Sequence, residues 1–232
     1  MAADSLRPYF TKKIINPVAS RLAKYKVTPD TLSIVSLVFS LIAGIFFYLA
    51  GTTTTFEPVW MLFAAGVCVL INSGLDAFDG AVARMMGIAG KKGDFLDHVI
   101  DRYADVFIIG GIIFGGLCPW QIGLIAIVGV LLTSYLGTQA QAMDIGRYYG
   151  GIMGRADRLI IILVGTLLDI IYIAIYDHSF LLYGLSFLGW VMVIIAIFSH
   201  VTAFQRIYHI WKAIKAEEKS KMQEIQSNDD NR

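Results

Sequence analysis

Four aspartates stand at regular intervals in an otherwise apolar stretch of this sequence. Asp76 and Asp79 are three residues apart, and Asp97 and Asp101 are four residues apart. These spacings put each pair on one face of an α-helix, which turns by about 100° per residue. Carboxylates among apolar residues are costly unless they pair with cations, face water or take part in chemistry. The pattern therefore predicts a site that gathers positive charge.

The short link between the two pairs predicts antiparallel neighbouring helices, with all four carboxylates at a common depth. Hard oxygen ligands of this kind suit Mg²⁺ or Mn²⁺. Two such ions about 3.5 to 4 Å apart can grip both sides of a phosphoryl displacement. Gly80, Ala83 and Gly93 are small enough to let the phosphates of a ligand approach the backbone. We therefore expect two Mg²⁺ or Mn²⁺ ions that bridge a diphosphate.

Composition places these acids in a membrane protein, because 56% of the 232 residues are hydrophobic and only 16% are charged. Apolar runs that could cross a bilayer occur at residues 32–49, 59–75, 106–117, 122–136, 159–176 and 180–198. The third run is too short by itself, so we extend it back through Asp97 and Asp101. The sequence predicts an all-α polytopic membrane protein with about six transmembrane helices and no nucleic-acid partner.

The distribution of basic residues predicts the orientation of these helices. Lys and Arg occur in the N-terminal segment, in the links 84–92 and 147–158, and after the last span. The links 51–58, 118–121 and 177–179 contain none. With six spans the two sets of links alternate sides, and the positive-inside rule puts the basic set in the cytosol. We expect a multi-pass protein of the cell membrane, with its active site and both termini on the cytosolic side.

Three regions follow from the same patterns. Residues 1–27 carry apolar residues every four positions, flanked by Lys and Arg, which predicts an interfacial amphipathic helix in the headgroup layer. Thr28 before Pro29 is a helix-start signal and opens the transmembrane domain, residues 28–211. Residues 212–232 form a polar cytosolic tail, which we expect to extend the last helix and then fray into disorder.

The aspartates belong to a longer signature, D-x2-D-G-x2-A-R-x8-G-x3-D-x3-D, in which every gap matches. Its eight positions are filled by Asp76, Asp79, Gly80, Ala83, Arg84, Gly93, Asp97 and Asp101. In these residues the chain resembles the CDP-alcohol phosphotransferases. The expected six-span topology of residues 28–211 agrees with that family. The resemblance implies an enzyme of phospholipid biosynthesis. Its reaction would move a substituted phosphoryl group from a CDP-linked lipid, CDP-diacylglycerol or CDP-archaeol, to a polar alcohol and release CMP.

The resemblance also implies roles for individual residues. Asp76, Asp79, Asp97 and Asp101 would hold two metal ions, and Asp101 would also be the catalytic base. The CDP-lipid would contact the start of the first span and the small and basic signature residues, namely Pro29, Asp30, Thr31, Leu32, Gly80, Ala83, Arg84 and Gly93. The resemblance further implies a homodimer surrounded by membrane lipids.

Three arginines point to the acceptor. Arg155 and Arg158 begin the fifth span and Arg206 ends the sixth, so all three reach the same side of the membrane. In family members whose acceptor is a phosphate ester, arginines in such places grip its phosphate. Arginine suits this task because it can give phosphate two parallel charge-assisted hydrogen bonds. We therefore expect a phosphorylated acceptor, inositol 1-phosphate ahead of glycerol 3-phosphate.

Two alternatives stay open at this point. The arginines could be ordinary positive-inside residues, in which case an unphosphorylated alcohol such as serine or inositol would be the acceptor. The aspartates could also form a relay in a metal-coupled or proton-coupled transporter, which is the usual interpretation of intramembrane acids. A relay does not require the glycines, alanine and arginine of the signature at fixed gaps, and for that reason we favour the enzyme.

Overall fold

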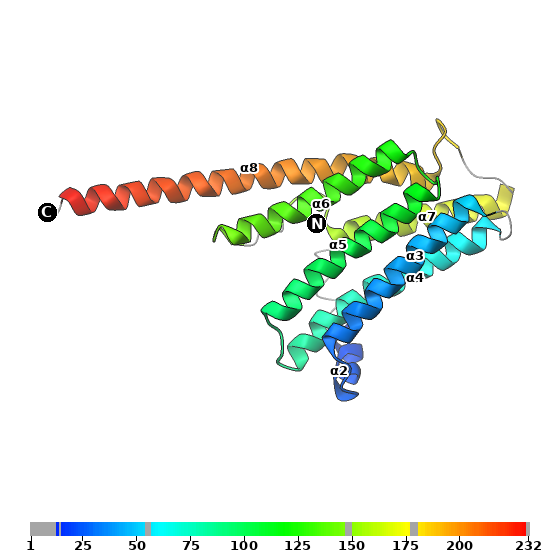
Figure 1. Ribbon diagram of the computed structural model, residues 1–232, viewed down its shortest axis with the longest axis horizontal. Coiled ribbons are helices and arrows are strands. Elements are labelled where there is room, and N and C mark those ends of the chain that lie inside the picture. The colour runs from blue at the N-terminus through cyan, green and yellow to red at the C-terminus, as the bar shows by residue number, and fades with distance from the viewer. Residues whose placement is uncertain (1–12, 14, 54–56, 147–149, 177–180, 231–232) are drawn as a thin grey trace.

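The structure is a computed structural model that describes residues 13, 15–53, 57–146, 150–176 and 181–230. These residues are almost entirely helical (Figure 1). The helices are α2 (Asn16–Lys24), α3 (Pro29–Thr52), α4 (Pro58–Met85), α5 (Lys91–Phe114), α6 (Trp120–Ala142), α7 (Arg155–Tyr176) and α8 (Phe187–Asp230). The all-α prediction is confirmed.

Five of the helices, α3, α4, α6, α7 and α8, are long and apolar enough to cross a membrane. The sixth expected span is α5, which has 24 residues and contains Asp97 and Asp101 as predicted. Its charged first half keeps its hydropathy below that of the other five, but it packs along α3 within the same bundle. The chain is thus a polytopic membrane protein with its acids on helices.

Helix α3 holds the two aspartate-bearing helices together. Both α4 and α5 pack extensively on α3, while α6 pairs with α8, and α7 packs on α4 and α8. Among the described residues, α4 and α5 pack on α3 rather than along each other. The two helices are antiparallel and bring their carboxylates together as expected, although each packs more on α3 than on the other. The two helices are joined by a short turn, and acids from both lie within 4.8 Å of one another.

The turn between α4 and α5 is built by glycine. Helix α4 ends at Met85, and Gly87 adopts a left-handed conformation with φ of 68°. The backbone N–H of Ile88 donates to the carbonyl of Ala83 at 3.1 Å, which satisfies the end of the helix. Gly90 then precedes the first residue of α5. This compact reversal keeps the ends of the two helices close enough to share ligands.

The last span begins later than the sequence predicts. The expected run 180–198 places its start before a turn in which Leu182 and Leu185 exchange backbone hydrogen bonds of 3.0 and 3.1 Å. Tyr183 and Gly184 have φ of 52° and 77° there, so the chain cannot be helical. Helix α8 starts at Phe187, where the carboxylate of Asp169 accepts backbone N–H groups at 3.0 and 2.9 Å. The difference arises because the turn before α8 is itself rich in apolar residues, which cannot be told from the start of a transmembrane helix by hydropathy alone.

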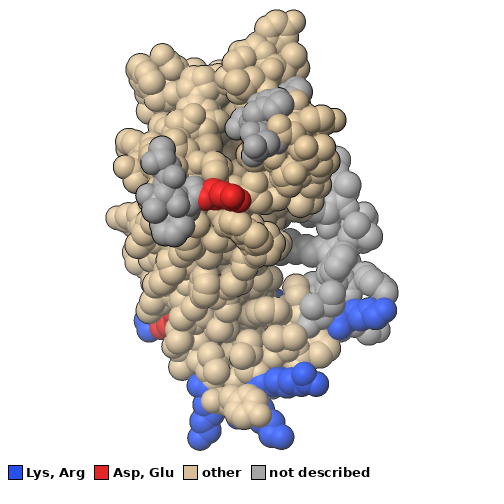
Figure 2. All heavy atoms as spheres, turned by 90° about the vertical axis from the view of Figure 1, so that its right-hand side faces the viewer, with Lys and Arg blue, Asp and Glu red and all other residues tan. Residues whose placement is uncertain are grey.

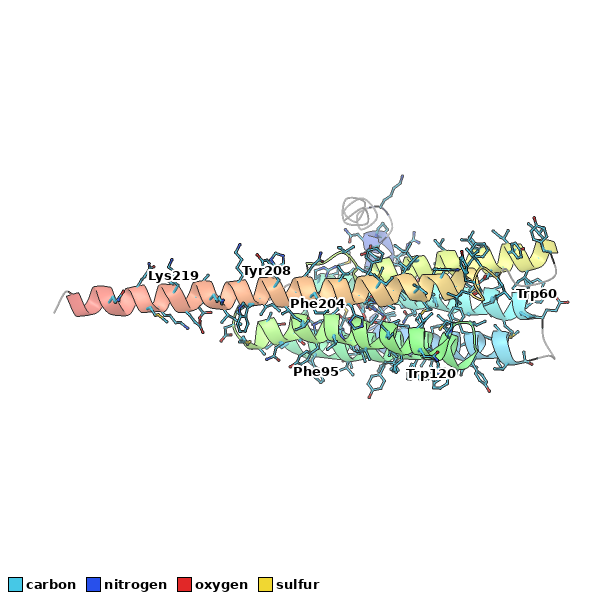
Figure 3. The ribbon with its side chains drawn as sticks, turned by 90° about the horizontal axis from the view of Figure 1, so that it is seen from above. Trp60, Phe95, Trp120, Phe204, Tyr208 and Lys219 are labelled. Atoms are coloured by element: carbon cyan, nitrogen blue, oxygen red, sulfur yellow. The ribbon has the colours of Figure 1, made fainter. Side chains whose placement is uncertain are left out.

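Helix α8 is much longer than a bilayer is thick. It has 44 residues, and at about 1.5 Å per residue such a helix is roughly twice the 30 Å hydrocarbon thickness. Its C-terminal part extends well beyond the bundle and carries Lys219 (Figures 1 and 3). Trp60 and Trp120 lie toward the other end of the molecule (Figure 3) and are mostly exposed, as expected for aromatic residues at a membrane interface.

Helix α2 packs on α4 near the aspartates. Ala19 is fully buried there and joins a small apolar cluster with Leu32, Ala81 and Val82. The face of the molecule in Figure 2 is mostly free of charge, and Lys and Arg gather at its lower edge. Helix α2 thus has an apolar side against the bundle, and it carries the basic residues Arg21 and Lys24. Both features fit an interfacial helix. The part of the predicted interfacial segment before residue 13 lies outside the described residues.

Candidate active site

The four signature aspartates come together at one end of the bundle. One carboxylate oxygen from each of Asp76, Asp79 and Asp97 lies within 4.8 Å of the others. Asp76 and Asp79 come from α4 and Asp97 from α5, so the cluster closes the gap between two helices. Asp79 is buried, whereas the side chain of Asp97 is 41% exposed. The cluster therefore has a sheltered side and a side open to ligands.

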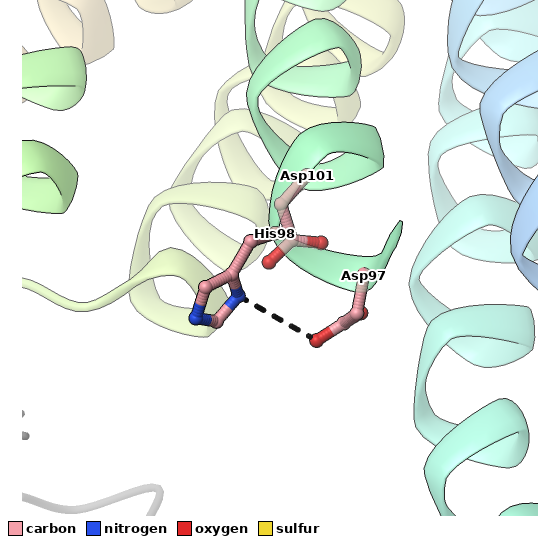
Figure 4. Close-up of side chains that lie close together, drawn as sticks. All are labelled: Asp97, His98 and Asp101. Atoms are coloured by element: carbon pink, nitrogen blue, oxygen red, sulfur yellow. Dashed lines mark ion pairs between the residues drawn. The ribbon is translucent and has the colours of Figure 1, made fainter. Parts of the chain in front are cut away.

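Asp101 lies one helical turn further along α5, where Asp97, His98 and Asp101 form a second group whose potential ligand atoms lie within 4.8 Å of one another (Figure 4). The imidazole Nδ1 of His98 is 4.0 Å from Asp97 Oδ2. His98 was not among the metal ligands expected from the sequence, and the four aspartates alone offer eight carboxylate oxygens. Asp97 belongs to both groups and links Asp101 to the α4 pair.

A serine that the sequence analysis did not select fixes the most buried acid. Ser33 Oγ donates to Asp79 Oδ2 at 2.6 Å, and both residues are buried. One turn deeper, the Asn72 side chain donates to the carbonyl of Ser36 at 2.8 Å. The sequence carries a signal for these buried hydrogen bonds, because Ser33, Ser36 and Ser40 recur on one face of an otherwise apolar helix.

The residues expected to contact the CDP-lipid border the cluster on two sides. Thr28 caps α3, accepting from the Thr31 backbone at 3.3 Å, and Pro29 is the first helical residue as predicted. Asp30 forms an ion pair of 2.8 Å with Lys92, which ties the start of α3 to the start of α5. Leu32 is buried one position before Ser33. Segment 29–32 therefore lies beside the aspartates.

The small and basic signature residues line the end of α4 and the start of α5. A methyl group added to Gly80 would lie 3.3 Å from the Arg84 guanidinium, so Arg84 folds back over Gly80. Ala83 is half-buried on the same helix. Gly93 is exposed, and no described atom lies within 4 Å of a methyl group added there. These positions leave space at the open side of the cluster.

Arg155 reaches into the aspartate cluster from the first residue of α7. Its Nη1 lies 2.6 Å from Asp76 Oδ2 and 2.6 Å from Asp101 Oδ1, and its side chain is 17% exposed. Within the part of the chain that the structure describes, its Nε and Nη2 have no hydrogen-bond partner. Arg155 thus joins α4, α5 and α7, and two of its nitrogens are available to another group.

Arg158 makes a second contact with α5, one turn further along α7. Its Nη2 donates to Asp105 Oδ2 at 2.7 Å, and both side chains are less than 9% exposed. Asp105 was missed by the sequence analysis, since it lies outside the signature. A signal existed, because it follows Asp101 by four residues on the same helix face. The two ion pairs make a ladder between α5 and α7.

Arg206 is engaged differently from the other two arginines. Its Nη1 donates to the carbonyl of Thr133 in α6 at 2.6 Å, and its Nε donates to the carbonyl of Gly150 at 3.0 Å. Thr202, one turn earlier on α8, accepts the Met153 backbone N–H at 3.1 Å. These contacts hold the segment just before Arg155. The structure brings Arg155 and Arg158 to α5, while it places Arg206 on backbone carbonyls.

The donor set fits divalent cations of the hard type. Three carboxylates from two helices converge within 4.8 Å, and oxygen donors are what Mg²⁺ and Mn²⁺ prefer. The nearest basic partners, Arg155 and Arg102, leave four carboxylates incompletely neutralised. Close carboxylates repel strongly unless cations lie among them. The residues that the sequence selected for two ions are therefore together in space.

Comparisons with known proteins agree with this geometry. The family model for CDP-alcohol phosphatidyltransferase matches residues 26–205. The chain is 30% identical to archaetidylinositol phosphate synthase of Pyrococcus horikoshii over 91% of its own length and 98% of that protein. It is 31% identical to phosphatidylinositol phosphate synthase of Mycobacteroides abscessus, covering 85% of this chain and 84% of that protein.

Solved structures show the same fold. Crystal structures of Mycobacterium tuberculosis phosphatidylinositol phosphate synthase, one with CDP-DAG bound and one in complex with manganese and citrate, both superpose with a TM-score of 0.67 at 26% identity. The first covers 86% of this chain and 94% of that protein, and the second 85% and 89%. Signature, fold and sequence agree, and the chain is therefore a phosphotransferase of the membrane-embedded CDP-alcohol phosphatidyltransferase family.

Proposed function

We propose that this enzyme transfers the lipid phosphatidyl-type group of CDP-diacylglycerol or CDP-archaeol to inositol 1-phosphate and releases CMP. The observation that carries the acceptor is Arg155, whose Nη1 touches Asp101 while its Nε and Nη2 have no partner among the described residues. Buried donors without acceptors favour an anionic ligand. The inositol phosphate synthases among the relatives support the same acceptor.

The four signature aspartates, Asp76, Asp79, Asp97 and Asp101, are proposed to hold two Mg²⁺ or Mn²⁺ ions. Bound ions of this kind neutralise a diphosphate and stabilise the charge that develops on the departing CMP oxygen. Ser33 keeps the buried Asp79 oriented. The solved relative in complex with manganese supports this choice of metal.

The nucleotide end of the donor is proposed to lie against segment 29–32 and the exposed ends of α4 and α5. Arg84 offers a guanidinium, and Gly80, Ala83 and Gly93 let phosphates approach the backbone. The Lys92 to Asp30 ion pair of 2.8 Å keeps the two sides of this surface together. A solved relative with CDP-DAG bound supports the donor class.

The chemical step needs one proton acceptor. The acceptor hydroxyl oxygen forms a bond to the lipid-side phosphorus, the bond from that phosphorus to the CMP oxygen breaks, and the hydroxyl proton passes to Asp101. Asp101 is placed for this because its carboxylate lies between Asp97 and Arg155, at the border of the metal and acceptor regions. Orientation of the attacking hydroxyl is a large part of such catalysis.

Arg155 and Arg158, with Arg206, are proposed to bind the acceptor phosphate. Arg155 and Arg158 both have a guanidinium nitrogen without a partner in the described part of the chain. Arg206 already donates two N–H groups to carbonyl oxygens, which leaves fewer donors for a phosphate. Mutation of Arg206 is therefore the direct test of its part in phosphate binding. The start of α7 adds partial positive charge near the phosphate.

The test is CMP release by purified protein with each CDP-lipid and a panel of inositol 1-phosphate, glycerol 3-phosphate, inositol and serine. We expect turnover with inositol 1-phosphate, and Arg155→Ala or Arg206→Ala should raise its KM by about 10- to 100-fold, the equivalent of losing hydrogen bonds to a charged group. Binding of the CDP-lipid should change little. Equal use of serine or inositol by the parent, with no change of KM in the variants, would exclude the phosphate clamp.

Two further proposals concern placement. The aspartate end, with both termini, is proposed to face the cytosol, which labelling of single introduced cysteines in intact cells would check. The homodimer that the family resemblance implies is also proposed, and a 680 Å³ apolar groove among α3, α5 and α6, lined in part by Gly110, Phe114 and Trp120, is its candidate contact surface. Gly110 and Phe114 lie on the side of α5 opposite to Asp97 and Asp101. Crosslinking across this groove would detect the second copy.

A further inference from the structure

One nitrogen of Arg155 lies between two proposed metal ligands on different helices. Arg155 Nη1 is 2.6 Å from Asp76 Oδ2 on α4 and equally 2.6 Å from Asp101 Oδ1 on α5. Arg102 also contacts Asp101, but through the other oxygen, Oδ2, at 3.3 Å, and it does not reach Asp76 in the described contacts. Arg155 is therefore the basic residue that bridges the two helices at the cluster.

A divalent cation and this nitrogen compete for the same two oxygens. Mg²⁺ binds oxygen at about 2.0 to 2.1 Å, so an ion shared by Asp76 and Asp101 would overlap the space that Nη1 fills. Both groups are positive, and the repulsion between them is strong where little water is present. Binding of an ion to these oxygens therefore favours release of one or both of them by Arg155.

Contacts on both sides hold the backbone that carries Arg155, so we assign the change of partner to its side chain. Arg158, one turn later, is held by Asp105 at 2.7 Å. Just before it, Gly154 N–H donates to Asp157 Oδ2 at 2.9 Å and Met153 N–H donates to Thr202 Oγ1 at 3.1 Å. A long side chain on a fixed helix start can swing between partners. Its Nε and Nη2 are donors that a phosphate can satisfy.

We propose that Arg155 is a built-in competitor for the metal site, and that the phosphate of the acceptor draws its guanidinium off Asp76 and Asp101. This inference rests on the proposed function. The metal displaces the guanidinium from the carboxylates, and the acceptor phosphate binds the displaced guanidinium. Metal binding and acceptor binding therefore favour each other. Coupling between two sites is reciprocal, so an acceptor phosphate must raise the affinity for metal as much as metal raises the affinity for the phosphate.

The experiment measures Mn²⁺ binding without turnover. Full-length protein in detergent is titrated with Mn²⁺, and the unbound ion is followed by its electron paramagnetic resonance signal, with and without inositol 1-phosphate and against a protein-free blank. The proteins are the parent, Arg155→Gln and Arg102→Gln. Arg102→Gln is the matched control, since it removes one positive charge beside Asp101 without emptying the bridging position.

We expect Arg155→Gln to bind Mn²⁺ at least about fivefold more tightly than the parent, the low end of typical coupling between sites, and Arg102→Gln to change much less. Inositol 1-phosphate should tighten Mn²⁺ binding to the parent but not to Arg155→Gln. The proposal is overturned if both variants tighten equally, if Arg155→Gln binds Mn²⁺ no better than the parent, or if inositol 1-phosphate leaves the parent unchanged.

The outcome is separable from that of the proposed function. The parent measurement with inositol 1-phosphate needs no variant, so a poorly folding Arg155→Gln protein would not prevent a decision. A parent that releases CMP with inositol 1-phosphate but shows no coupling to Mn²⁺ retains its function and loses this inference. A parent whose Mn²⁺ binding tightens with inositol 1-phosphate but which releases no CMP with it loses the proposed function and retains this inference.

Discussion

Two groups of intramembrane carboxylates differ in what satisfies them. Asp169, near the end of α7, is buried and accepts the backbone N–H groups of Phe187 and Leu188 at 3.0 and 2.9 Å. The aspartates at the other end of the bundle meet mainly each other and a shared arginine. Asp169 therefore caps α8 and is satisfied by backbone N–H groups of the protein itself. The cluster, in contrast, holds negative charge that the described protein groups only partly compensate.

This difference separates structural from chemical acids better than burial does. Asp79 and Asp169 are 6% and 4% exposed, so exposure alone would class them together. Asp169 stabilises the start of α8, where the backbone N–H groups have no partner within the helix. Asp79 faces other acids from two helices. An intramembrane acid points to function when other acids lie beside it, even where a hydroxyl also donates to it, as Ser33 does to Asp79.

The strongest test of the contrast removes one charge from the cluster. Asp97→Asn and Asp76→Asn should lower CMP release at limiting Mg²⁺ by at least about a thousandfold, because metal stabilisation of phosphoryl oxygens is worth several kcal/mol. Folding should tolerate the change, since it relieves repulsion among the acids. Thermal unfolding in detergent is the control. A folded variant with near-normal turnover would contradict the two-metal assignment.

A smaller loss is expected at Asp101, where binding and chemistry can be separated. Asp101→Asn keeps the size of the side chain and one oxygen, so affinity for the CDP-lipid should stay within about tenfold of the parent, or roughly 1.4 kcal/mol. Turnover should fall by about a hundredfold, as is typical when a general base is lost. Calorimetric binding and CMP release provide the two readouts. A parallel loss of both would assign Asp101 to metal binding alone.

Ser33 extends the comparison to the residues behind the cluster. Ser33→Ala removes the 2.6 Å hydrogen bond to Asp79 and should weaken Mn²⁺ binding by about 10-fold, since partners of metal ligands commonly contribute 10- to 100-fold. Ser40→Ala is the matched control, because its hydroxyl bonds only to its own helix in the described contacts. If the two variants bind Mn²⁺ equally well, Ser33 has no part in orienting Asp79.

Asp169 should show the opposite behaviour. Asp169→Asn replaces one accepting oxygen with an NH₂ group, so one backbone N–H at the start of α8 loses its partner. We expect a loss of about 1 to 3 kcal/mol in the free energy of unfolding, the usual penalty for a buried polar group left unpaired, with turnover per folded molecule unchanged. Denaturant unfolding and CMP release of the same sample would decide. A large fall in turnover would end the distinction between the two groups.

The sequence predicted the fold class and the aspartate cluster because both depend on local pattern. Hydrophobic runs and the spacing of Asp97 and Asp101 follow from helix geometry alone. The partners of the arginines depend on tertiary packing. Arg158 pairs with Asp105, 53 residues away, and Arg206 with the carbonyl of Thr133, 73 residues away. No local spacing encodes such pairs, so three similar arginines received one prediction and took three different sets of partners.

The helix boundaries also show where local pattern fails. Thr28 and Pro29 predicted the start of α3, because a cap residue and a proline act through the nearest backbone groups. The start of α8 depends on Asp169, which lies 18 and 19 residues before the N–H groups that it accepts. The sequence around residues 180–187 therefore carried too little information to place the end of the turn.

Helices α3 and α5 cross at glycines far from the aspartates. A methyl group added to Gly111 would overlap the backbone of Gly44, and one added to Gly44 would overlap the carbonyl of Phe107. The two backbones thus touch at this crossing, and again one turn further on, where a methyl group added to Gly115 would meet the backbone of Phe47 and Tyr48. Asp101 lies ten residues from Gly111 on α5, which is about 15 Å along the helix axis at 1.5 Å per residue. A difference of a few degrees in the angle between α3 and α5 would therefore displace Asp101 by roughly an ångström relative to α3, so these distant glycines also set the position of a carboxylate in the cluster.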